Sequence, residues 1–309
     1  MSTRATTTRP AGSAAGRNRT GGARRTPEER TFGVLRWVTV AALLLVTVFP
    51  FYYMVVLSFV PIEQLLTRPQ QIWPALESLT LDTYRSVLAS PEDEGFGFAR
   101  FLRNSALVSA AAVVITLLAS IPGAYAVARI PFFGRRQVSV LFLTVYLFPT
   151  IVLAVPLFIA FAKLGIQDSL VGLMLVYFVM TVPVSIYMLR QYFQTIPEGL
   201  EEAATLDGAG RLRTLRHITL PLALPSIVST GVYVFMIAWN EFLFALLFLS
   251  AQPELWTVSL GLAQLSEGIE VPKTVLMAGS VILTLPVIVL YGLVERFLTE
   301  GLTSGAEKG

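Results

Sequence analysis

Residues 274–294 of this 309-residue chain read TVLMAGSVILTLPVIVLYGLV, a run that contains no Asp, Glu, Lys, Arg or His. An α-helix needs about 20 consecutive apolar residues to cross the hydrocarbon core of a bilayer, because each residue advances it by about 1.5 Å. The run therefore has the length and the composition of one transmembrane helix.

Five further apolar stretches have the same character, and they cover residues 37–59, 106–127, 138–162, 169–189 and 227–249. The whole chain is 54% hydrophobic and 14% charged, with a mean hydropathy of +0.68, which is too apolar for a soluble domain. Prolines interrupt five of the six stretches, and neighbouring helices tolerate such kinks by satisfying the freed carbonyl groups. The sequence thus predicts an all-α membrane protein with six transmembrane helices.

The distribution of basic residues predicts the orientation of these helices. Residues 1–36 contain eight arginines, and placing them in the cytoplasm puts 129–137, 190–226 and 295–309 on the same side. That side then carries 17 of the 23 lysines and arginines, as is typical of cytoplasmic segments. No aromatic residues interleave with the arginines of the tail, so we expect it to contact lipid rather than nucleic acid. The predicted parts are a disordered tail at 1–31, a membrane domain at 32–298 and a second tail at 299–309, with both termini cytoplasmic.

The scarcity of cysteine and histidine excludes several kinds of chemistry. The chain has no cysteine and one histidine, His217, which excludes disulfides, thiolate nucleophiles and clustered histidine metal sites. An intramembrane hydrolase is disfavoured, because His217 lies among arginines and no G-x-S-x-G sequence occurs. The phosphate-binding pattern G-x-x-x-x-G-K-[ST] is absent as well, so energy from ATP would have to come from another chain.

Residues 195–225, between the fourth and fifth predicted spans, form the most specific segment. Thr195 to Glu198 fit a capping box with proline in the first turn, which predicts a short helix from there through Ala204. Asp207-Gly208 should break it, and a second short helix from Arg211 to Arg216 should end at Leu220-Pro221. Such a pair of helices suits either coupling to a partner protein or an ordinary amphipathic connector on the membrane surface.

This segment resembles the EAA loop of ABC importer permeases in Glu202-Ala203-Ala204, Asp207-Gly208-Ala209, Ile218 and Leu220-Pro221 with Pro225. The chain is similar, more narrowly, to the carbohydrate uptake permeases, in particular the smaller six-span subunit of maltose- and trehalose-type systems. Three further stretches carry the likeness, at Leu81–Tyr84, Ala124–Arg129 and Trp239–Phe242.

The resemblance implies a permease bundle whose residues 198–217 sit in a groove of an ATP-hydrolysing subunit. The ATPase-coupling residues that it implies are Glu202, Ala203, Ala204, Asp207, Gly208, Ala209, Ile218, Leu220 and Pro221. It also implies several partners: a second homologous permease, two ABC subunits that hold ATP and Mg²⁺, an extracytoplasmic solute-binding protein and a sugar. We therefore expect a non-catalytic, cofactor-free transporter subunit in the cytoplasmic membrane of a prokaryote.

Glu241 is the one acidic residue within a predicted span, and Asn240 precedes it. A polar residue at such a position serves either as a structural hydrogen-bond hub or as part of a translocation pathway. Aromatic residues able to stack on a sugar, but more often used for packing, are Tyr146, Tyr177, Tyr187, Tyr233 and Trp239. An ion-coupled secondary transporter remains the alternative, although it needs ion-coordinating groups at mid-membrane and Glu241 alone is thin support.

Overall fold

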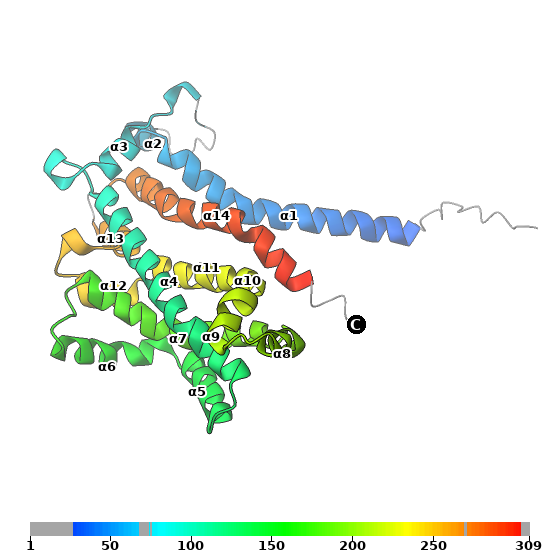
Figure 1. Cartoon of the computed structure of the whole chain (residues 1–309). Helices are drawn as coiled ribbons and strands as arrows, with labels where there is room; N and C mark the ends of the chain where they lie inside the picture. The colour runs from blue at the N-terminus through cyan, green and yellow to red at the C-terminus, as the bar shows by residue number, and fades with distance from the viewer. Residues whose placement is uncertain (1–26, 68–73, 75, 269–270, 304–309) are drawn as a thin grey trace, which may run out of the picture. The chain divides into compact units, whose positions relative to one another are not determined.

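The computed structural model describes residues 27–67, 74, 76–268 and 271–303, and every regular element within these residues is helical (Figure 1). Four helices are long and apolar enough to cross a membrane, and they coincide with four of the six predicted spans: α1 (Pro27–Ser58), α4 (Phe98–Arg129), α7 (Leu170–Phe193) and α14 (Lys273–Thr303). Both α1 and α14 extend past the predicted domain boundaries at 32 and 298. The remaining parts of the two predicted tails, 1–26 and 304–309, lie outside the described residues.

The other elements are shorter helices that connect or cover the long ones. They are α2 (Ile62–Thr67), η1 (Leu76–Ser78), α3 (Asp82–Leu88), η2 (Pro91–Asp93), α5 (Arg135–Leu147), α6 (Thr150–Lys163), α8 (Glu198–Leu206), α9 (Arg211–Thr214), η3 (Leu215–Thr219), α10 (Leu220–Leu222), α11 (Leu224–Asn240), α12 (Leu243–Leu249), η4 (Pro253–Leu255) and α13 (Val258–Glu267). Residues 52–309 form one compact unit, and the packing described below lies within it.

The centre of this unit is the crossing of α4 and α7, on which α11 also packs. Val108 and Ala112 of α4 belong to the same buried cluster as Tyr177 of α7. Thr116 and Thr181 share a hydrogen bond of 2.9 Å between the two helices. Small and hydroxyl-bearing side chains are favoured at such crossings. Apolar side chains gain little by leaving lipid, so close packing and hydrogen bonds must hold the helices together.

The outward faces of the helices are apolar, as expected for contact with lipid. Leu118 of α4 is 70% exposed and Leu293 of α14 is 65% exposed. Prolines 122, 183 and 286 lie inside continuous helices, so the predicted tolerance of proline within these three is confirmed.

The stretch 138–162 is not one straight helix, in contrast to the prediction. It divides into α5 and α6, which are bent by 99° at Phe148-Pro149. Phe148 and Pro149 both have extended backbones, with ψ of 131° and 119°. Proline lacks the N–H of a helical turn and disfavours the helical conformation of the residue before it, which favours a break at this position.

The stretch 227–249 is divided as well. α11 ends at Asn240, Glu241 is extended with ψ of 132°, and α12 begins at Leu243. A second bend, of 77°, lies just before α11, between residues 211–222 and 224–240. The structure therefore has four helices of spanning length. The number of spans rises to six at most if two bent pairs, α5 with α6 and residues 211–222 with α11, each count as one span.

The segment before α14 is folded onto the long helices rather than open. The side-chain amide of Asn104 in α4 donates to the carbonyl oxygens of Glu254 (2.9 Å) and Trp256 (3.1 Å). Ser105 accepts the N–H of Val258 at 2.8 Å and so holds the start of α13. Residues 251–267 thus form a packed covering of α4.

Candidate coupling site

The two-helix knob, residues 198–222, begins at Glu198 without the predicted capping box. Pro197 occupies the N-cap position, and no side chain caps the helix. The hydroxyl of Thr195 donates to the carbonyl oxygen of Tyr192 at 2.8 Å, and Thr195 lies two residues before the N-cap position. Glu198 and Glu201 in the first turn favour helix formation instead, because carboxylates interact well with the positive end of the helix dipole.

The predicted break at Asp207-Gly208 is confirmed. Gly208 has φ of +82°, a conformation that costs little only for residues without a side chain. The N–H of Ala209 donates to the carbonyl of Ala204 at 2.9 Å, and that of Gly208 to Thr205 at 3.0 Å. This pair of bonds is the Schellman motif, which satisfies the last carbonyls of α8 and reverses the chain within a few residues.

The second helix of the knob does not end at Leu220-Pro221, where the prediction placed its end. It runs from α9 through the π-helical turn η3 and into α10, ending at Leu222. Proline within a helix leaves the fourth preceding carbonyl unbonded and clashes with it. The wider π turn just before Pro221 makes room for the ring, so the helix continues through Pro221 to Leu222.

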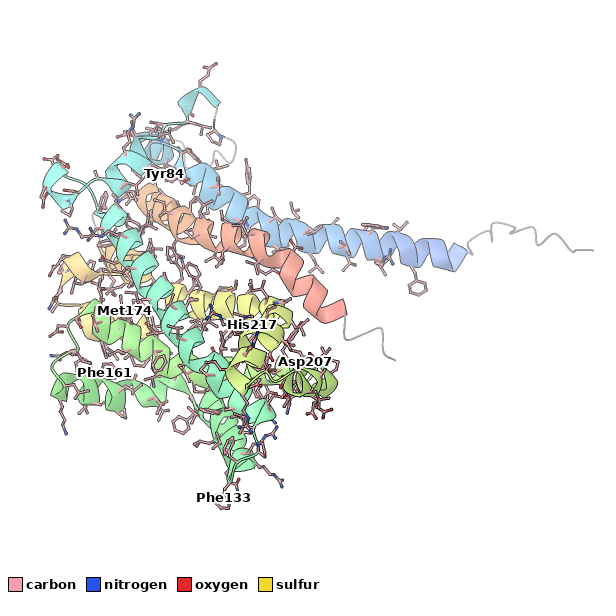
Figure 2. The ribbon with its side chains drawn as sticks, in the orientation of Figure 1. Tyr84, Phe133, Phe161, Met174, Asp207 and His217 are labelled. Carbon is pink, nitrogen blue, oxygen red and sulfur yellow. The ribbon has the colours of Figure 1, made fainter. Side chains whose placement is uncertain are left out.

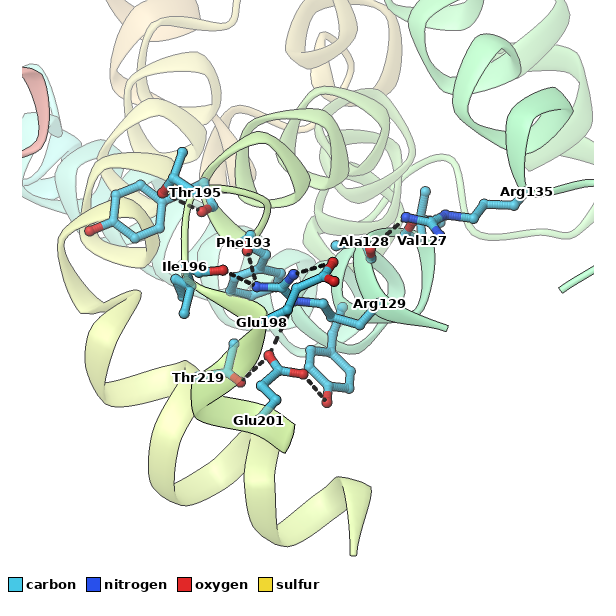
Figure 3. Close-up of polar contacts among 12 residues, drawn as sticks. Val127, Ala128, Arg129, Arg135, Phe193, Thr195, Ile196, Glu198, Glu201 and Thr219 are labelled. Atoms are coloured by element: carbon cyan, nitrogen blue, oxygen red, sulfur yellow. Dashed lines mark hydrogen bonds and ion pairs between the residues drawn. The ribbon is translucent and has the colours of Figure 1, made fainter. Parts of the chain in front are cut away.

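Arg129, the last residue of α4, ties the knob to the long helices. Its side chain is 7% exposed. Nη2 donates to the carbonyl oxygens of Phe193, at 2.7 Å, and Ile196 (Figure 3). Nε donates to Glu201 Oε1 at 3.2 Å, and Nη1 donates to Glu198 Oε1 at 3.1 Å. One guanidinium therefore joins the end of α4 to the end of α7 and to α8.

Glu201 is the matching acidic residue, and its side chain is 15% exposed. Besides Arg129, its carboxylate accepts hydrogen bonds from the hydroxyls of Thr219, at 3.0 Å, and Tyr125, at 3.2 Å (Figure 3). Three donors from α4 and η3 thus converge on one carboxylate of α8. Breaking such a buried pair costs about 3–5 kcal/mol, because the remaining charge is left uncompensated. The knob is therefore fixed to α4 more firmly than a surface connector would be.

A surface hollow lies beside this link, and both acidic and basic residues line it. The hollow measures about 720 Å³ and is lined by Tyr125, Arg129, Ile130, Glu198, Glu201, Glu202, Thr205, Leu206, Ala209, Gly210, Arg211 and Thr214. Leu206 and Leu212 are 90% and 78% exposed, so the surface of the knob is apolar at two positions. Asp207 lies at the outer end of the knob (Figure 2).

The residues that the resemblance assigned to coupling differ in their exposure. Glu202, Ala203, Asp207, Gly208 and Pro221 are exposed, whereas Ala209, Ile218 and Leu220 are half-buried. Ala204, which the resemblance also assigned to coupling, is only 7% exposed, so it offers little surface to a partner.

Sequence reasoning missed four residues of the site. It did not identify Arg129 and Glu201 as a link, nor Leu206 and Leu212 as exposed apolar side chains. The available signal was an arginine that ends an apolar helix and acidic residues in the first turn of another.

Glu241 lies in a separate polar site at the break between α11 and α12. Its carboxylate accepts the hydroxyl of Tyr177 at 2.8 Å and the N–H groups of Phe244, at 2.9 Å, and Ala245, at 3.2 Å. These contacts cap α12 and favour the structural-hub alternative. The amide of Asn240 donates to the carbonyl of Met236 within its own helix at 2.9 Å, and the side chain is exposed. A pathway role for Asn240 and Glu241 stays a prediction.

Two of the aromatic candidates are packing residues. Tyr177 is fully buried, and the indole N–H of Trp239 donates to the carbonyl of Leu283 at 2.9 Å. Trp239 also stacks on Phe235, with ring centroids 5.4 Å apart. Within the described part of the chain, no group of three or more His, Cys, Asp and Glu is arranged to hold a metal ion.

Residues 116–302, which include the knob and Glu241, match the model of the family "Binding-protein-dependent transport system inner membrane component". The chain is 38% identical over 269 residues to the inner membrane ABC transporter permease protein YcjP of Escherichia coli, covering 87% of this chain and 94% of that protein. It is 38% identical over 267 residues to the trehalose/maltose transport system permease protein MalG of Thermococcus litoralis, covering 86% and 93%. It is also 36% identical over 234 residues to the trehalose transport system permease protein SugB of Mycobacterium tuberculosis, covering 75% and 83%.

The fold is shared with a solved transporter. A chain in the crystal structure of a bacterial ABC transporter involved in the import of the acidic polysaccharide alginate superimposes with a TM-score of 0.75. The identity is 23%, and the superposition covers 88% of this chain and 98% of that one.

Proposed function

Since this chain belongs to the family of binding-protein-dependent transport system inner membrane components and is therefore a permease subunit of an ABC importer, we propose that the solute it moves is a sugar. Two relatives that align over most of their length are named for trehalose and maltose, and for trehalose. ATP hydrolysis in this family belongs to a separate subunit, so the chain acts without covalent chemistry.

The proposed topology has six spans in the cytoplasmic membrane of a prokaryote, with both termini inside. α5 and α6 together make the third crossing despite their bend. The fifth crossing is α11 with α12, as the stretch 227–249 predicts, and residues 211–222 before it belong to the knob and not to that crossing. The distribution of the basic residues supports this arrangement, because the knob then lies on the arginine-rich side.

The proposed partners are a second permease, two ATPase subunits that bind ATP and Mg²⁺, and an extracytoplasmic solute-binding protein. The knob sits in a groove of one ATPase subunit, with Glu202, Ala203, Asp207 and Gly208 on its free surface. The solute-binding protein docks on the opposite side, where residues 251–267 form part of the surface.

The buried link between Arg129 and Glu201 is the observation that supports coupling most directly. Because Glu201 is in the knob and Arg129 ends α4, a displacement of the knob by the ATPase moves α4 rather than flexing a loop. α4 packs on α7 and α11, so that displacement reaches the core of the bundle. An ordinary amphipathic connector would not require such a link.

Substitution of Gly208 tests this mechanism in the complete transporter in proteoliposomes. A valine at Gly208 is strained at φ of +82°, so we expect sugar uptake to fall while ATP hydrolysis continues. Gly210→Ala is the matched control, because Gly210 has an ordinary φ of −74° and open space around it. Normal uptake by Gly208→Val would refute the coupling role of the turn. Uptake by the chain alone, driven by an ion gradient, would favour the secondary transporter instead.

A further inference from the structure

Three arginines converge on one hollow at the junction of α5 and α7. Arg135 and Arg136 begin α5, and Arg190 lies in the last turn of α7. The hollow measures about 530 Å³, and its lining, which we call the arginine pocket, consists of Arg135, Arg136, Ser139, Val140, Leu143, Tyr187 and Arg190. A second hollow of about 520 Å³ shares Arg136 and Val140 with it. Both fall within the range of about 300–1,000 Å³ that is typical of small-molecule sites.

The arginine pocket is an unpaired concentration of positive charge. No acidic residue lines either hollow. In the part of the chain that the structure describes, the ion pairs involve only Arg85 and Arg129 among the arginines, so no cation of the pocket is neutralised. The Nε of Arg190 is buried and has no hydrogen-bond partner. An anion in the pocket would supply both the missing charge and the missing acceptor.

One of the three arginines is held in place by the backbone. The Nε of Arg135 donates to the carbonyl oxygen of Val127 at 2.6 Å, and Nη2 donates to that of Ala128 (Figure 3). These carbonyls belong to the last turns of α4, so the guanidinium caps that helix while it keeps its charge. The pocket is therefore partly preorganised for an anion.

Apolar surface adjoins the charges on the same helix. Val140 and Leu141 of α5 are 56% and 58% exposed, one turn or more beyond the arginines. Phe133, which precedes the two arginines in the chain, is fully exposed at a tip of the molecule (Figure 2). A cationic pocket followed along a helix by exposed aliphatic side chains matches the two parts of a phospholipid, an anionic headgroup and its acyl chains.

We propose that the arginine pocket binds the phosphate of an anionic phospholipid, phosphatidylglycerol or cardiolipin, with an acyl chain along Val140 and Leu141. The guanidinium groups of Arg136 and Arg190 contact the phosphate oxygens, and Arg135 contributes its fixed charge. This assignment goes beyond sugar transport and does not rest on it, because it requires only that α5 and α7 lie in a bilayer.

Native mass spectrometry of the purified full chain tests the proposal. The protein in detergent is mixed with equal amounts of phosphatidylglycerol and phosphatidylcholine, and the ratio of the two retained lipids is measured. We expect wild type to retain phosphatidylglycerol preferentially. The double variant Arg136→Gln/Arg190→Gln should lower that ratio about 25-fold, because each arginine near an anionic surface contributes about fivefold. Such a change corresponds to about 2 kcal/mol at 1.4 kcal/mol per tenfold.

The matched control is Arg103→Gln. Arg103 is an exposed arginine of α4 outside the pocket, so its replacement removes the same charge and should leave the ratio unchanged. The single variant Arg136→Gln covers the case in which replacing the half-buried Arg190 impairs folding. Arg136 is exposed, and the expected effect of its loss alone is about fivefold.

Three results would overturn the proposal. The first is equal retention of the two lipids by wild type, or an unchanged ratio in the Arg136→Gln variant. The second is binding of inorganic phosphate that an excess of phosphatidylglycerol does not displace, which would identify a soluble anion as the ligand. The third is a double variant that retains lipid normally but no longer assembles with the partner permease, which would assign the pocket to a subunit interface.

Discussion

Removing the charge of Glu201 should destabilise the protein much more than removing that of Glu198, although both glutamates bind the same arginine. Glu201→Gln keeps the shape of the side chain and leaves Arg129, which is 7% exposed, without its buried partner. Loss of one member of a buried pair costs about 3–5 kcal/mol. We expect a value near the lower end, about 3 kcal/mol, because Glu198 still lies 3.1 Å from Nη1.

Glu198→Gln is the matched control for this prediction. The side chain of Glu198 is 75% exposed, and a solvent-screened pair of this kind contributes about 0–1 kcal/mol. The free energy of unfolding can be measured by titration with sodium dodecyl sulfate in mixed micelles, followed by the loss of helical circular dichroism. Equal destabilisation by the two substitutions would refute the argument that burial of the Arg129–Glu201 pair, rather than its charge alone, fixes the knob.

Three further predictions follow from other contacts. Leu206→Ser and Leu212→Ser should each change the free energy of unfolding by less than about 0.5 kcal/mol, because both leucines are exposed. Both substitutions should nevertheless weaken co-purification with the ATPase subunit. Undiminished co-purification would exclude the two leucines from that interface. Glu241→Ala should cost about 1–2 kcal/mol of stability through the lost cap of α12 and leave the choice of sugar unchanged in uptake assays. An altered sugar preference at normal stability would instead support the pathway role. Gly279→Ala should destabilise the protein by about 1–3 kcal/mol, since a Cβ there would lie 2.8 Å from Phe98. Gly292→Ala in the same helix is the control, because a Cβ at Gly292 has no atom within 4 Å. Thermal unfolding in detergent compares the two variants, and equal melting temperatures would contradict the packing argument.

The sequence predicted the membrane class and the four unbroken spans because each depends on a local property. A run such as 274–294 is apolar over the thickness of a bilayer, and no tertiary contact is needed to recognise it. The turn at Gly208 was predictable for the same reason, since Asp-Gly favours a left-handed residue at the end of a helix.

The breaks at Pro149 and Glu241 were not predicted, although both lie in apolar stretches of spanning length. Prolines 122, 183 and 286 have comparable surroundings in the sequence and remain inside their helices, so proline alone does not decide the outcome. At Glu241 the break is stabilised by Tyr177, which lies 64 residues earlier in the chain. Hydropathy averages over such a stretch cannot reveal a long-range hydrogen bond.

The position of the two-helix knob was predicted from the sequence, its internal contacts were not, and its coupling role stays a prediction. The resemblance indicated the surface of the knob, while the link beneath it joins Arg129 to Glu201 across 72 residues. Pro221 was expected to end a helix, and the π turn at 215–219 overrides that local rule. Both features depend on how α4, α8 and η3 pack together.

The exposed leucines of the knob should affect the stability of the chain in the cell before it assembles with its partners. In the proposed topology the knob lies in the cytoplasm, so Leu206 and Leu212 stay in contact with water until another protein covers them. Burying a leucine is worth about 1.5–3 kcal/mol. An unassembled copy therefore exposes two leucine side chains that favour aggregation, and a bound partner that covers them stabilises the chain by mass action. Synthesis of the chain together with its ATPase should accordingly raise its steady-state abundance in the cell.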